Sequence, residues 1–191
     1  MAIQNLNASE KQIFWGNLLL IVCCAFYLAW WLLAFKPTGA VKGMKTGWLL
    51  IPAFVAGLIS IILVVKGVQS AAIRVALFPN GSLLWGGIAA YFILLAVTCL
   101  FFHRQVTTEL LLIVGWAALA LSEINVLYGM DRFSHGLSAG FAVMIGAAAL
   151  ISLICYVLYY NLGTLAGYFD GMIPLFMVAL IMAGISVAMS V

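Results

Sequence analysis

Six long apolar stretches dominate the sequence, and each is long enough to cross a lipid bilayer as a helix. They run roughly over residues 13–35, 47–66, 82–102, 109–128, 138–160 and 172–190. A hydrocarbon core about 30 Å thick requires about 20 mainly apolar residues in a helix, because lipid offers no hydrogen-bonding partner to an open backbone amide. The sequence therefore predicts an all-α integral membrane protein with six transmembrane helices, forming a single transmembrane domain over residues 1–191.

Composition agrees with this prediction and excludes several other classes of protein. The chain is 67% hydrophobic and 7% charged, whereas soluble domains contain about 25% charged residues. A soluble globule and a disordered tail are excluded, and the eight Lys and Arg residues form no basic run that would bind nucleic acid. The expected surroundings are a lipid bilayer, and since the spans occupy nearly the whole chain, any function must lie within the bundle or at its mouths.

The first apolar stretch is expected to be a retained span, because its apolar run is too long for a cleaved signal peptide and only one basic residue, Lys11, precedes it. The orientation of the chain stays undecided. Alternate ends of the spans carry four basic residues each, which gives no positive-inside preference. These two sets are Lys11, Lys66, Arg74 and Arg132, and Lys36, Lys42, Lys45 and Arg104.

Two pairs of similar segments, each separated by 92 positions, indicate an internal repeat. The pairs are residues 17–22 with 109–114, and residues 56–65 with 148–157. The candidate halves, 13–102 and 109–190, contain three spans each, and an odd number of spans reverses the second half across the membrane. We therefore predict a 3+3 inverted repeat, an arrangement in which many transporters place a binding site near the midplane between the repeats.

Glycines recur at intervals of four at the entrances to three spans. They are Gly39, Gly43 and Gly47 before the second span, Gly136 and Gly140 at the fifth, and Gly163, Gly167 and Gly171 before the sixth. Residues four apart share one helix face, and without side chains two helices approach closely enough for dispersion to hold them together in lipid. These glycines are predicted to pack helices within the chain; a homodimer face and a hinge are the functional alternatives.

One ionisable residue lies well inside a predicted span. Glu123 is about five residues from the end of the fourth span, where a charge costs about 2.5–3.5 kcal/mol on insertion scales. Helical geometry places Trp116 on the same face of the helix and Asn125 about 160° away. Lys66, at the end of the second span, is the expected partner. We predict a role in a solute or ion pathway for these four residues; a structural ion pair and a contact with another subunit remain alternatives for Glu123.

The sequence lacks the usual signatures of catalysis and cofactor binding. It contains no Ser-His-Asp order, paired carboxylates, H-E-x-x-H, phosphate-binding loop or haem ligand pair, and its four cysteines lie in apolar runs without C-x-x-C spacing. We expect no catalytic residues, no metal and no cofactor, and an enzyme is the less favoured interpretation. The leading hypothesis is a transporter or channel for a small solute. The alternative is a non-catalytic subunit or assembly partner in a larger membrane complex.

Overall fold

The computed structural model describes residues 6–35, 46–79, 81–102, 108–159 and 161–191, and the regular secondary structure of these segments consists of helices joined by short connections. Six helices or helix pairs have the length and hydropathy of membrane spans, as the sequence predicts. The helices are α1 (Ala8–Ala34), α2 (Leu50–Ser70, preceded by the short 3-10 turn η2, Thr46–Leu49), α3 (Ser82–Phe102), α4 (Thr108–Gly129), α5 (His135–Tyr159), α6 (Thr164–Asp170) and α7 (Ile173–Ser190). The chain is an integral, multi-pass membrane protein.

Helix α1 begins five residues before its predicted start because its first turn is capped. The side chain of Asn7 accepts a hydrogen bond from the Glu10 amide at 2.8 Å, and the Asn7 amide donates to Glu10 Oε2 at 2.7 Å. This reciprocal arrangement is a capping box, which satisfies amides that the first turn of a helix otherwise leaves open. The polar residues before the first apolar run are therefore part of the helix rather than a tail.

The sixth span consists of two helices instead of one. The predicted span, 172–190, corresponds to α7, while α6 lies in the expected connection between the fifth and sixth spans. Gly171 ends α6, and Pro174 lies in the first turn of α7. Proline has no amide hydrogen and is tolerated only near the start of a helix, so a continuous helix through residues 170–174 is disfavoured.

The helices group into two compact units. Unit 1 comprises Met1–Ala71 and Ile154–Val191, and unit 2 comprises Ala72–Leu153, so the boundary falls within α5. The predicted repeat halves, 13–102 and 109–190, divide the chain at other positions. The inverted repeat stays a prediction, since nothing in the fold of either unit tests it.

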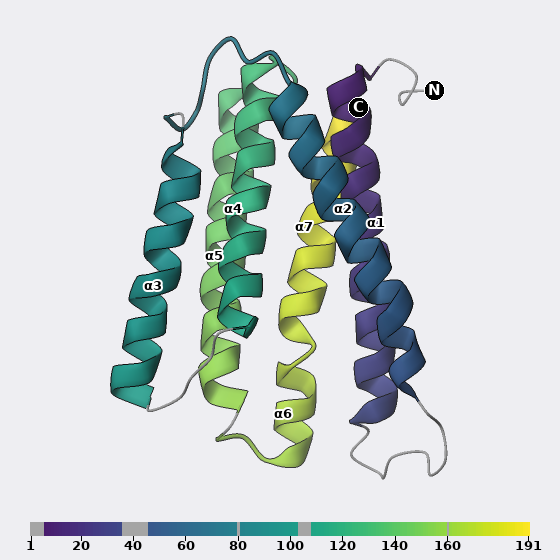
Figure 1. Ribbon diagram of the computed structural model, residues 1–191, viewed down its shortest axis with the longest axis vertical. Coiled ribbons are helices and arrows are strands. Elements are labelled where there is room, and N and C mark those ends of the chain that lie inside the picture. Colours follow the sequence, from purple (N-terminus) through teal and green to yellow (C-terminus); the bar gives the residue numbers. More distant parts are fainter. Residues whose placement is uncertain (1–5, 36–45, 80, 103–107, 160) are drawn as a thin grey trace. The chain divides into compact units, whose positions relative to one another are not determined.

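Unit 1 is built on close packing of α1 against α2, with α7 against α1 (Figure 1). A Cβ atom added to Gly16 would lie 3.2 Å from the backbone oxygen of Ser60, and one added to Gly67 would lie 2.9 Å from the backbone oxygen of Ser9. Ser60 Oγ also donates to the Gly16 carbonyl at 2.7 Å. The two helix backbones therefore approach to a distance that only glycine permits.

Unit 2 contains α3, α4 and most of α5. Helix α3 packs against α4, and a Cβ added to Gly87 would lie 3.2 Å from the methyl group of Ala118. Most of the large apolar side chains of α3 are exposed, as expected for a helix that faces lipid. The segment before α3 returns to the end of α4, where the Arg74 amide donates to the Gly129 carbonyl at 3.0 Å.

Candidate functional site

Glu123 is fully buried in unit 2. Its exposed fraction is 0%, and every residue from Glu123 to Leu127 is buried. Of the six spans in the described residues, α4 has the largest buried share. An ionised carboxylate inside a membrane span is costly, so a buried acid there is unusual.

Trp116 lies two turns before Glu123 on the same helix. Its indole Nε1 is buried, and it donates to no acceptor among the described residues. Ser138, in the first turn of α5, is also fully buried in unit 2, and its hydroxyl likewise has no partner in the described part of the chain. Buried polar groups are normally hydrogen-bonded, so each of these two departs from the usual pattern.

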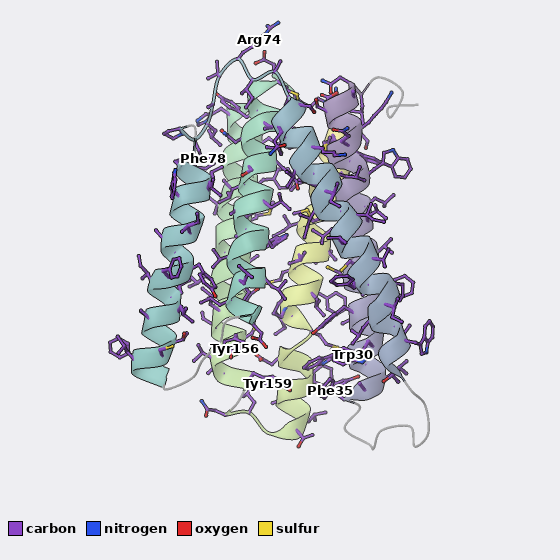
Figure 2. All side chains as sticks on the ribbon, viewed as in Figure 1. Trp30, Phe35, Arg74, Phe78, Tyr156 and Tyr159 are labelled. Atoms are coloured by element: carbon purple, nitrogen blue, oxygen red, sulfur yellow. The ribbon has the colours of Figure 1, made fainter. Side chains whose placement is uncertain are left out.

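Asn125 holds the connection between α2 and α3. Its Oδ1 accepts a hydrogen bond from the Phe78 amide at 2.8 Å, and its Nδ2 approaches the Phe78 carbonyl at 3.5 Å. Figure 2 labels Phe78 and Arg74, which lie on this connection within unit 2. Asn125 thus has a structural contact that the sequence did not indicate, and its place in a solute pathway stays a prediction.

Replacing Asn125 with alanine is expected to release this connection from α4. The partly buried Phe78 amide would lose its acceptor, at a cost of about 1 kcal/mol. Hydrogen exchange at Phe78 should become about fivefold faster, whereas the same change at the exposed Asn161 should leave it unaltered. Equal exchange rates in the wild type and the Asn125→Ala variant would contradict this assignment.

Lys66 belongs to unit 1 and is exposed. It lines an open depression of about 360 Å³ together with Gln12, Gln69 and Ser70. The predicted pair of Lys66 with Glu123 joins residues of different units, and it stays a prediction.

The glycines with the closest contacts are mostly not those that the sequence singled out. A Cβ at Gly47, Gly136, Gly140 or Gly163 would meet no atom within 4 Å, and Gly39 and Gly43 lie outside the described residues. Packing by these six, within the chain or between copies, stays a prediction. Gly171 is tightly packed, because a Cβ there would clash with the Trp31 ring, and Gly167 is in ordinary contact with Tyr159 at 3.7 Å.

Two further buried polar residues were missed by sequence reasoning. Asn17 of α1 is fully buried, and neither its Oδ1 nor its Nδ2 has a partner among the described residues. Asp170, the last residue of α6, is 9% exposed, and its buried Oδ2 has no hydrogen-bond partner in the described segments. An asparagine and an aspartate near predicted span ends are unremarkable in the sequence, since only the packing of unit 1 shows that they are buried.

The described residues contain no group of three His, Cys, Asp or Glu side chains that would hold a metal ion. The four cysteines, Cys23, Cys24, Cys99 and Cys155, are all free thiols. The buried polar groups of the described residues include those of Glu123, Ser138, Asn17 and Asp170.

Comparisons with known proteins found no relative of this chain. No family model matches the chain, and neither a curated protein nor a solved structure is significantly similar to it.

Proposed function

We propose that the chain is a small polytopic transporter or channel for a small solute, with Glu123 at or near the pathway. The observation that carries this proposal is the complete burial of the Glu123 side chain in the most buried of the described spans. Acids inside membrane spans are costly, and they commonly mark substrate paths, ion paths or proton relays.

The other buried polar atoms of unit 2 support the same proposal. Glu123 lies six residues before the end of α4, and Ser138 lies three residues after the start of α5. At a rise of about 1.5 Å per residue, the two lie about 9 Å and 5 Å from the helix ends that the 130–134 connection joins. Both are therefore close to one end of this helical hairpin. A polar solute or a chain of waters would supply the partner that the Ser138 hydroxyl lacks among the described residues.

Flux through proteoliposomes tests this function. The purified full chain would be assayed with a panel of small acids, amides and cations, alongside Glu123→Gln, which retains the shape of the side chain and removes its charge. We expect solute flux from the wild type and at least a tenfold lower rate from Glu123→Gln, equivalent to about 1.4 kcal/mol in the barrier.

Glu109→Gln is the matched control. Glu109 lies in the first turn of the same helix and is exposed, so the same change there should preserve the flux. Equal flux in the two variants would remove Glu123 from the mechanism. If a folded, monodisperse chain supports no flux and mild detergent recovers a stoichiometric partner, the subunit hypothesis replaces this one.

A further inference from the structure

Asp170 is a second buried acid, and it lies in unit 1 where α6 meets α7. We propose that Asp170 binds a monovalent cation, either a proton or a sodium ion. The proposal does not depend on transport, because it concerns occupancy of a site by a cation and is tested by binding. Three features of Asp170 support it: an open carboxylate oxygen, a backbone carbonyl that faces a proline four residues on, and the absence of an ion pair with a basic residue in the described part of the chain.

The side chain of Asp170 is more than nine-tenths buried, and its Oδ2 accepts no hydrogen bond from the described residues. Within the described residues, an ion pair joins Arg74 to the other aspartate, Asp131, in unit 2. Burial disfavours an ionised carboxylate unless its charge and both of its oxygens are compensated. A bound cation would supply the missing positive charge.

The break between α6 and α7 provides a second oxygen acceptor at the same residue. In a continuous helix, the Asp170 carbonyl would accept a hydrogen bond from the amide of residue 174. That residue is Pro174, which has no amide hydrogen. Asp170 therefore combines an unpartnered carboxylate Oδ2 with a main-chain carbonyl that cannot receive the usual bond from residue 174. Interrupted helices are where membrane transporters coordinate sodium ions or protons with side chains and unwound carbonyls.

The neighbours of Asp170 favour a cation over an anion. The thiol of Cys155, in the part of α5 that belongs to unit 1, interacts directly with the carboxylate. From α1, the uncharged ring of Trp31 lies against Gly171, and its Nε1 donates to the Tyr168 carbonyl at 3.0 Å. This indole proton is therefore already engaged, and it is not directed at the carboxylate.

Two phenols lie near this position among the described residues of unit 1. Tyr168 is on α6 itself, and its hydroxyl donates to the Leu32 carbonyl at 3.4 Å. Tyr159, on α5, lies beside Trp31 with the two rings tilted and their centroids 5.9 Å apart. Figure 2 labels Tyr159 with Trp30 and Phe35, all of which lie in this aromatic end of unit 1. Helix α7 contributes no charged side chain. Aromatic faces attract cations, so these aromatic neighbours are compatible with a cation bound at Asp170.

A cation would not need to cross much hydrocarbon to reach the site. Asp170 is six residues after the start of the sixth span, at Thr164. At the rise of an α-helix this corresponds to about 9 Å from the beginning of the span. Exchange with water at that membrane face is therefore expected without opening of the whole bundle.

The composition of the chain makes a direct test feasible, because Asp131 and Asp170 are its two aspartates. Asp131 is exposed, so Asp131→Asn is a mild background in which carboxyl-labelled [¹³C]aspartate reports on Asp170 alone. The purified full chain in lipid would be examined by carbon NMR and infrared spectroscopy, in sodium chloride and in choline chloride at one pH. Radioactive sodium binding would be measured on the same samples, and Asp170→Asn would serve as the loss-of-site variant.

Each outcome has a definite meaning. A carboxylate signal that shifts on replacing choline with sodium, with sodium binding at least tenfold weaker in Asp170→Asn, supports a sodium site. A neutral-acid signal that ignores sodium and changes with pH supports a proton site. A carboxylate signal that is the same in both salts and at every pH where the protein is folded would overturn the proposal. Since Asp170 is retained in the labelled protein, the result does not depend on the folding of Asp170→Asn, and it stands whether or not Glu123 affects flux.

Discussion

Replacing Trp31 with alanine is expected to lower the stability of unit 1 by about 2–3 kcal/mol. The Trp31 ring fills the space over Gly171, where no Cβ would fit, and its Nε1 bonds to the Tyr168 carbonyl. It also stacks on Phe35 with ring centroids 4.4 Å apart. Truncation removes these dispersion contacts and leaves a cavity, and loss of a large buried ring typically costs about 3–5 kcal/mol. We place the effect below that range because Trp31 is only partly buried.

Unfolding in mixed detergent micelles measures this effect. Trp85→Ala is the control, because Trp85 also lies near a span end but is 70% exposed, and its loss should change stability by less than about 0.5 kcal/mol. Trp31→Phe should fall between the two, since it keeps a ring and removes one hydrogen bond, worth about 0.6 kcal/mol in a membrane. Equal stability of Trp31→Ala and Trp85→Ala would show that the Trp31 ring does not hold α6 against α1.

Replacing Gly67 with leucine is expected to force α1 and α2 apart. A Cβ at this position already lies 2.9 Å from the Ser9 carbonyl and 3.2 Å from the Ile13 amide. These are backbone atoms, so a change of rotamer cannot relieve the contact. Overpacking of this kind costs about 1–3 kcal/mol, and the separation would also lengthen the 3.0 Å hydrogen bond between the hydroxyls of Ser9 and Ser70.

Gly86→Leu is the matched control for this second prediction. Gly86 is also a helical glycine, but a Cβ there meets nothing within 4 Å. Leucine is a better helix former than glycine, so this variant should be as stable as the wild type or slightly more so. The comparison uses the same unfolding assay. A Gly67→Leu protein as stable as Gly86→Leu would mean that the α1 and α2 backbones are not in close contact at Gly67.

The spans were predictable because the bilayer imposes a length and a composition that can be counted in a sequence. All six are found, and α7 begins within one residue of its predicted start. The differences arise from local polar interactions. The capping box of Asn7 and Glu10 extends α1 toward the amino terminus, while α6 is too short to produce a recognisable apolar run.

The candidate site was only partly predictable, for a different reason. Glu123 could be identified because a charge deep inside an apolar stretch is conspicuous, and the structure buries it fully. Asn17 and Asp170 are polar residues near span ends, where exposure to headgroups and water is the usual expectation. Their burial depends on which helices pack together. The close contacts of Gly16 and Gly67 depend on the packing of α1 against α2 in the same way, and neither glycine belongs to a spacing pattern that marks it in the sequence.

The division of the chain also determines the order in which its parts can assemble during synthesis. Unit 1 is discontinuous in sequence, because residues 72–153 of unit 2 separate the α1–α2 hairpin from α6 and α7. At about 5–20 residues per second, the ribosome needs several seconds to make that intervening segment. During this time the hairpin exists without α7, its later neighbour in unit 1. Unit 1 is thus completed only after every residue of unit 2 has been translated, so its α1–α2 hairpin must persist for that time without the α1–α7 contacts.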